Sequence, residues 1–184
     1  MRRIRTCLLA LIGVAVFAAG PARADQTDPS LANLFLALHK TEDNRTAAVL
    51  TRQIWQAWLT VDDQIVSDQL NAGTAHMAAN RFEEALSSFD AVIDARPDIA
   101  EGWNKRATLY FIMGDYDASA MDIAETLKRE PRHFGAVSGQ GYIYLRRDNT
   151  DDALKWFKRA LALNPHLTVI RAMVTQLEGE ATQI

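Results

Sequence analysis

Three prolines at one fixed interval constrain the fold of this chain more than any other feature. Pro97, Pro131 and Pro165 stand 34 residues apart. A constant interval of roughly 20 to 50 residues is typical of arrays in which one supersecondary unit is repeated, so that neighbouring units bury each other's apolar faces. The predicted units span residues 66–97, 100–131 and 134–165.

Small and large residues recur at matching positions of the three units. Gly73, Ala107 and Gly141 form a small column, which we expect where the two helices of a unit approach closely. Each unit is therefore predicted to be a helix, a short turn and a second helix. The remaining columns are a large one (His76, Tyr110, Tyr144), a second small one (Ala85, Ser119, Ala153) and a bulky one (Phe89, Ile123, Phe157).

These columns, with Trp103 seven residues before Tyr110 and the closing prolines, resemble the tetratricopeptide repeat. The resemblance covers residues 66–165, over half of the chain, and departs from the usual pattern at Arg106, where leucine is common. It implies an all-α, tetratricopeptide-type solenoid of helical hairpins that binds proteins in a concave groove. Trp103 is expected to be buried between helices.

The first 24 residues have the pattern of a secretory signal. Three arginines precede the apolar run 8–19, and Ala22-Arg23-Ala24 supplies small residues at a cleavage site. The run is shorter than the roughly 20 residues that span a bilayer, so an uncleaved anchor is the weaker alternative. We expect an exported bacterial protein, cleaved after residue 24 and located in the periplasm, without membrane insertion after cleavage.

The chain is predicted to divide into four parts. Residues 25–61 form an N-terminal helix pair, which is either a separate element or a degenerate repeat, and in which Trp55 and Trp58 either pack internally or form a homodimer face. Residues 62–165 hold the three repeats. Residues 166–184 form a C-terminal capping helix and tail, because Ile170, Met173, Val174 and Leu177 make one apolar stripe at helical spacing.

Helix starts are predicted from capping residues. Asp98 with Glu101 three positions later resembles a capping box. Asp115 and Thr150 are expected to begin the second helices of the later repeats.

Three glycines fall in one predicted helix, at positions 135, 139 and 141. Each interior glycine costs about 1 kcal/mol relative to alanine. Either a neighbour or a ligand comes close to the backbone of this helix, or the helix is locally weak, and we favour the close approach.

Composition excludes several classes of function. Removing residues 1–24 takes away four of the 20 Lys and Arg and none of the 23 acids, which leaves a net charge of about −7. Dispersed cations in an acidic chain argue against nucleic acid as a partner. The four histidines are scattered, the single cysteine lies in the signal, and no glycine-rich phosphate loop is present, so we predict no enzyme, no cofactor and no metal site.

The resemblance places the candidate binding residues on the concave face. Two asparagines offer a donor and an acceptor for a peptide unit, a methionine and two aromatics offer apolar surface, and two cations can meet a carboxylate. In the alternative interpretation, Met77, Phe111 and Leu145 only complete the core. The predicted groove residues are Asn71, Thr74, Met77, Asn104, Lys105, Thr108, Phe111, Ser138, Tyr142 and Arg146.

Chaperone-binding members of the family hold a terminal carboxylate with a clamp of lysine, asparagine and arginine. The matching positions here are Leu70, Thr74, Gly135 and Gly139, so this clamp is absent. The sequence predicts a non-enzymatic adaptor of the cell envelope that holds a peptide or helix of a partner protein, and favours a monomer. The alternative is a structural or regulatory subunit of a larger envelope assembly that interacts through the helix of Trp55 and Trp58 or homodimerises.

Overall fold

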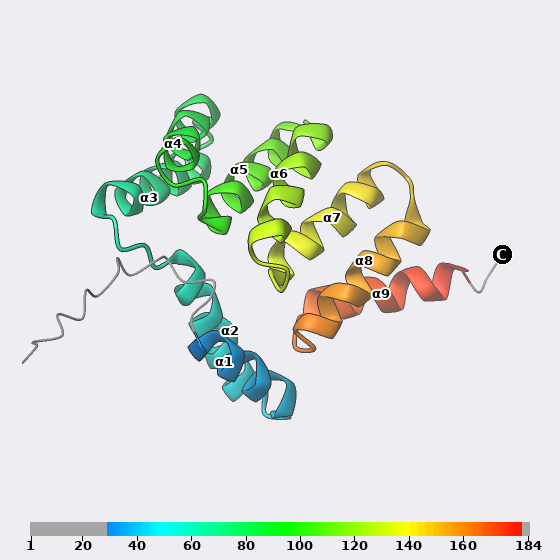
Figure 1. The fold of residues 1–184 in the computed structure, drawn as a ribbon. Coiled ribbons are helices and arrows are strands. Elements are labelled where there is room, and N and C mark those ends of the chain that lie inside the picture. The colour runs from blue at the N-terminus through cyan, green and yellow to red at the C-terminus, as the bar shows by residue number, and fades with distance from the viewer. Residues whose placement is uncertain (1–28, 182–184) are drawn as a thin grey trace, which may run out of the picture.

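A computed structural model describes residues 29–181, which form nine α-helices and no strand (Figure 1). The predicted signal lies outside the described residues. Within them the predicted all-α class is confirmed. The helices are α1 (Pro29–Lys40), α2 (Asn44–Leu59), α3 (Gln64–Ala78), α4 (Phe82–Ala95), α5 (Ala100–Met113), α6 (Tyr116–Arg129), α7 (Phe134–Arg146), α8 (Thr150–Leu163) and α9 (Thr168–Ala181).

The hairpins α3/α4, α5/α6 and α7/α8 coincide with the predicted units and pack side by side. In the first and third units a phenylalanine ring lies flat against a glycine: a Cβ built at Gly73 would stand 2.5 Å from Phe89 Cε1, and one at Gly141 would stand 2.5 Å from Phe157 Cε1. The middle unit has Ala107 in the small column and Ile123 in the bulky one. Alanine takes more space than glycine, and isoleucine takes less than phenylalanine. The two changes compensate, as close packing of the interior requires.

The turn inside each hairpin contains one residue with left-handed backbone. Asn80, Gly114 and Asp148 have φ values of 57°, 84° and 56°. They occupy equivalent positions, 34 residues apart. Asparagine and aspartate are the non-glycine residues that tolerate this conformation best, so all three units make the same turn with different residues.

Two of the predicted helix starts differ in detail. Asp115 caps α6 as expected, since its side chain accepts a hydrogen bond of 3.0 Å from the Ala118 N–H. The capping box at Asp98 and Glu101 was wrong. Asp98 instead pairs with Arg96 at 2.9 Å, while the Glu101 side chain is turned into the interior. Helix α8 is capped one residue earlier than predicted, by Asn149.

Arg106, at the position where leucine is usual, joins three helices. Its guanidinium donates to Asp122 of α6 at 2.7 and 2.9 Å and to Asp90 of α4 at 2.6 Å. These carboxylates raise the pKa of Arg106. Trp103 packs against the guanidinium groups of Arg106 and Arg129 and is only half-buried, so it is less buried than expected for a side chain between helices.

Helix α9 closes the array. Ile170, Val174 and Leu177 are buried against α8 in one cluster with Phe157. This matches the capping helix predicted from its apolar stripe.

The N-terminal hairpin α1/α2 does not stack on α3 as a further unit. In Figure 1 it lies beneath the arch formed by α3 to α9. Its buried residues form one cluster with Phe134, the first residue of α7. The hairpin thus folds back on the array and packs against the third repeat at the start of α7. Its buried members are Leu31, Phe35, Leu38, Ala47, Ile54 and Trp58.

Between residues 29 and 181, no helix combines the length and the apolarity that crossing a bilayer requires.

Candidate protein-binding surface

The first helices of the three hairpins form a continuous inner layer, because α5 contacts both α3 and α7. The ten predicted groove residues all belong to these three helices. The structure separates them into two groups, according to whether the N-terminal hairpin covers their part of the layer.

Helix α2 covers the start of α7. Trp55 lies against Gly135, where a Cβ would stand 2.6 Å from Cη2 of the indole. The Trp58 ring stacks on His133 with centroids 4.2 Å apart and planes 18° apart. The Trp58 indole N–H also donates to Glu130 Oε2 at 3.3 Å. The close approach predicted from the glycines of α7 is confirmed, and at Gly135 the neighbour is the chain's own tryptophan.

A buried polar network lies behind this contact. The Ala136 N–H donates to His133 Nδ1 at 3.0 Å, so the ring proton sits on Nε2 and is donated to Glu101 Oε2 at 2.9 Å. The amide nitrogen of Asn104 donates to both oxygens of Glu101 at 3.2 Å. Lys105 stands 3.5 Å from the same carboxylate. Two predicted groove residues, Asn104 and Lys105, are therefore engaged inside the protein.

The hairpin also contacts the loop before α9. His166 Nε2 lies 3.1 Å from the Leu38 carbonyl, and the Asn164 amide donates to Thr51 Oγ1 at 3.2 Å. The hairpin thus spans from the start of α7 to the start of α9. The start of α7 is thus covered by the chain itself.

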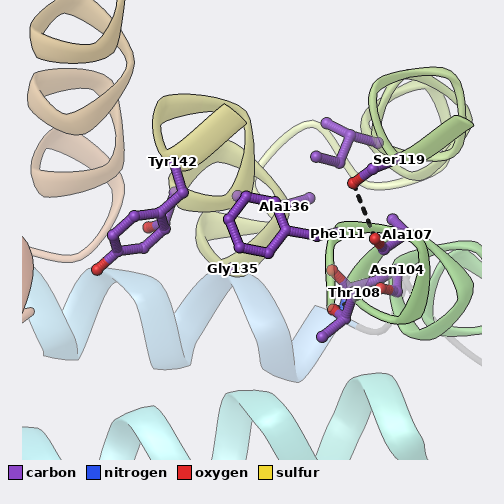
Figure 2. A pocket seen from close by; sticks show the side chains of 11 residues that line it. Asn104, Ala107, Thr108, Phe111, Ser119, Gly135, Ala136 and Tyr142 are labelled. Carbon is purple, nitrogen blue, oxygen red and sulfur yellow. Dashed lines mark hydrogen bonds between the residues drawn. The ribbon is translucent and has the colours of Figure 1, made fainter. Parts of the chain in front are cut away.

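Beyond the hairpin contact, a cavity of about 220 Å³ opens between α5 and α7 (Figure 2). Ile123 of α6 also contributes to its lining. Phe111 and Tyr142 come from opposite sides of the cavity, with ring centroids 6.5 Å apart. Five of the predicted residues line it: Asn104, Thr108, Phe111, Ser138 and Tyr142.

Some polar groups around the cavity already have a hydrogen-bond partner within the protein, and others do not. The hydroxyls of Thr108 and Ser138 donate to carbonyls of their own helices at 2.9 and 2.8 Å. Asn104 Oδ1 and the Tyr142 hydroxyl have no hydrogen bond to any residue of the 29–181 region. Burial raises the pKa of Tyr142, so its hydroxyl stays protonated and able to donate.

The remaining predicted residues lie around or away from the cavity. The Arg146 guanidinium stands 5.9 Å from the Phe111 ring centroid and is exposed. On α3, Asn71 is exposed, the Thr74 hydroxyl donates to the Leu70 carbonyl, and Met77 packs against the core cluster of the first unit. These three do not line the cavity.

Sequence reasoning missed the buried set Glu101, Glu130 and His133, each at most 1% exposed. One signal was present. His133 stands 34 residues after Ile99 and 34 before Leu167, so it is a polar residue in an otherwise apolar column. Such an exception indicates a specific buried partner, here Glu101 and Trp58.

Comparison with known proteins agrees with this architecture. The family model described as "Tetratricopeptide repeat" matches residues 70–126 and 105–167, which together exceed half of the chain. This chain belongs to the tetratricopeptide repeat family. A TPR repeat-containing protein of Rhizobium etli is 35% identical over 135 residues, covering 73% of this chain and 66% of that protein. Human DnaJ homolog subfamily C member 3 is 30% identical over 100 residues, which are 54% of this chain but 20% of the human protein.

Solved structures of tetratricopeptide domains share the fold at low identity. The first TPR of Spaghetti (RPAP3) bound to an HSP90 peptide has a TM-score of 0.61 and 19% identity over 66% of this chain and 97% of that one. MamA has a TM-score of 0.58 and 16% identity over 76% of this chain and 80% of that one. Two of the four positions at which the chaperone-binding clamp is absent lie on α7. Trp55 packs against Gly135, and Gly139 lines the cavity.

Proposed function

We propose that this tetratricopeptide repeat protein is a non-enzymatic adaptor of the cell envelope, which holds a peptide or helix of a partner protein on its concave face. The observation that carries the proposal is the open cavity between α5 and α7, where five predicted residues converge. Proteins of this family are generally interaction scaffolds without catalysis. Structural neighbours are described as bound to HSP90 and HSP70 peptides, which supports peptide binding as the use of such a face.

The envelope location is supported by the sequence of residues 1–24, with its arginines, apolar run and cleavage-site residues. Cell fractionation of the source bacterium with an antibody to this chain tests it. The processed chain is expected in the periplasmic fraction. Recovery of an unprocessed chain in the cytoplasm would contradict export.

The alternative route, through the helix of Trp55 and Trp58, has less support. Trp58 is 3% exposed and its indole is engaged by Glu130 and His133 of the same chain. A homodimer that uses Trp58 would require the hairpin to leave the array. We therefore propose a monomer, and sedimentation at several protein concentrations checks it.

Crosslinking in cells tests the adaptor role. A photoreactive amino acid at Thr108, which lines the cavity, is expected to capture a discrete envelope protein. The same group at Met121 serves as the matched control, because this residue is 65% exposed on α6 and does not line the cavity. Capture at Met121 with none at Thr108 would contradict binding on the concave face.

A further inference from the structure

The chain's own hairpin divides the inner layer into a filled part and an open part. The first turns of α5 and α7 are covered through Glu101 and His133, whereas Thr108, Phe111 and Tyr142 in the later turns border the cavity. The two parts meet at Gly135, which touches Trp55 on one side and lines the cavity on the other. The cavity therefore adjoins the surface of α7 on which the Trp55 indole packs.

The shape of the cavity suits one large apolar side chain. Small residues, Ala107 and Gly139, leave room between the helices, and Ile123 adds an apolar wall. At Gly139 a Cβ would stand 3.3 Å from Ile123 Cδ1, so even one added carbon would narrow the space. Apolar cavities of about 150 Å³ already admit a benzene ring. The volume of about 220 Å³ therefore has room for a leucine or phenylalanine side chain.

Besides the Tyr142 hydroxyl, Asn104 Oδ1 has no hydrogen-bond partner in the described part of the chain, and both residues line the cavity. Asn104 is 8% exposed, and its amide nitrogen is held by Glu101. Since a carboxylate only accepts hydrogen bonds, the nitrogen of Asn104 must face Glu101, and Oδ1 is the free atom. No residue in the described part of the chain donates to Oδ1. A buried acceptor is stabilised by a donor, and the backbone N–H of a bound segment supplies one.

The charge at the rim is positive. Arg146 lies one turn after Tyr142 beside Phe111 and makes no ion pair with a residue between 29 and 181. Two other cations of these helices already have acidic partners: Lys105 stands 3.5 Å from Glu101, and Arg147 donates to Asp117 at 2.5 Å. Arg146 is therefore the cation available to an acidic group of a partner.

We propose that the cavity between α5 and α7 is a socket for one bulky apolar side chain of a partner segment, whose adjacent acidic residue pairs with Arg146. This proposal rests on the adaptor function above and specifies what its concave face recognises. The backbone N–H of the anchored residue donates to Asn104 Oδ1. Because the hairpin fills the neighbouring part of the layer, the recognised segment is short.

A peptide library tests the socket directly. Phage that display random twelve-residue peptides are selected on the chain from residue 25 onward, and enriched peptides are synthesised with a fluorescein label for anisotropy measurements. We expect enriched peptides to share a leucine, isoleucine, phenylalanine or tryptophan next to aspartate or glutamate. Replacing the apolar residue by alanine should weaken binding at least about tenfold, since the lost apolar contact is the main contribution.

Matched variants locate the binding. Thr108→Phe fills the mouth of the cavity, and Thr74→Phe makes the same change at the equivalent position of the first unit, outside the cavity. Both threonine hydroxyls only bond a carbonyl of their own helix, so both variants should fold, which circular dichroism checks. Thr108→Phe should abolish peptide binding and Thr74→Phe should leave it unchanged.

A charge reversal tests the rim. Arg146→Glu should weaken binding of the acidic peptide about threefold, as expected for a solvent-exposed ion pair, and should favour a peptide in which lysine replaces the acid. Lys128→Glu is the control, because Lys128 is exposed on α6 and does not line the cavity.

The outcomes separate this proposal from the adaptor function. If peptides bind but tolerate Thr108→Phe, or show no apolar anchor, the socket is wrong while a concave-face adaptor stands. If no peptide is enriched on the wild-type chain over Thr108→Phe, the socket is also overturned, and crosslinking from Thr108 in cells decides separately whether the adaptor function survives.

Discussion

The contact between Trp55 and Gly135 provides a mutational test of whether the N-terminal hairpin packs on α7. Adding a methyl group in Gly135→Ala would place Cβ 2.6 Å from Cη2 and 3.1 Å from Cζ2 of the indole. Such overpacking costs about 1 to 3 kcal/mol. Gly135 is the second residue of α7, where alanine regains at most about 1 kcal/mol relative to glycine. We therefore expect Gly135→Ala to lower the free energy of unfolding by about 0 to 3 kcal/mol.

Removing the indole should reverse the sign. In a Trp55→Ala background the nearest side-chain atom left near the new Cβ is His133 Cε1 at 3.2 Å, and the helix propensity of alanine then dominates. Gly135→Ala should stabilise that background by up to about 1 kcal/mol. The coupling between the two sites is thus about 1 to 3 kcal/mol.

Urea unfolding followed by circular dichroism measures the four variants of this cycle. Gly179→Ala is the control, because a Cβ there meets nothing within 4 Å and its effect should be the same in both backgrounds. If Gly135→Ala changes the free energy of unfolding equally with and without Trp55, the indole does not lie on α7. The docked hairpin, and with it the division of the concave face, would then be refuted.

Three further outcomes follow from the packing. Arg106→Leu should lower the free energy of unfolding by about 3 to 5 kcal/mol, because it leaves the Asp122 carboxylate, which is 4% exposed, without its cation. In the same urea assay, adding Asp122→Ala should recover most of this loss. Trp58→Phe keeps a ring on His133 but loses the indole N–H to Glu130, so it should cost about 1 kcal/mol, against about 3 to 5 kcal/mol for Trp58→Ala. Because burial raises the pKa of Tyr142 above its unfolded value, its contribution to stability is complete below the unfolded pKa and is lost as pH rises through the folded pKa; in an ultraviolet titration, one tyrosine transition above the usual pH range should disappear in Tyr142→Phe.

The repeat architecture could be predicted because its determinants recur. A position such as Ala107 has counterparts in two other units, and the periodic prolines separate the units. The pairing of Gly73 with Phe89 and of Ala107 with Ile123 shows that the small and bulky columns are complementary within each unit. Information of this kind is local, since each contact lies within one hairpin.

The placement of the hairpin could not be predicted because its contacts are unique and distant in sequence. Trp58 meets Glu130, 72 residues away, and no second unit repeats this pair. The capping box failed for the same reason. Glu101 has the right spacing from Asp98, but His133, 32 residues on, binds its carboxylate instead. Capping rules consider only neighbours in the sequence. They cannot anticipate that a buried residue far along the chain binds the side chain instead.

The same difference explains why the repeat register could assign the predicted groove residues to the inner helices but could not show which of them line the cavity. The repeat register places Asn104, Thr108 and Tyr142 on the inner helices, and all three border the cavity. The register does not reveal that α2 covers the turns that precede them. The Asn104 side chain takes part in both regions. Its amide nitrogen donates to Glu101 in the network beneath the hairpin, and its amide oxygen remains available to a partner.

Two glycines one helical turn apart on α7 illustrate how a single helix serves both contacts. Each costs about 1 kcal/mol of helix stability. At Gly135 that cost is offset by an indole packed directly on the backbone. At Gly139 the described chain offers only Ile123 Cδ1, at 3.3 Å, and the rest of the space is the cavity. If internal packing were the only use of this face, alanine at 139 would pack with a small shift of Ile123 and would stabilise the helix. Glycine at 139 is instead the residue that keeps the cavity open, which is why the open part of the face is the one we assign to a partner.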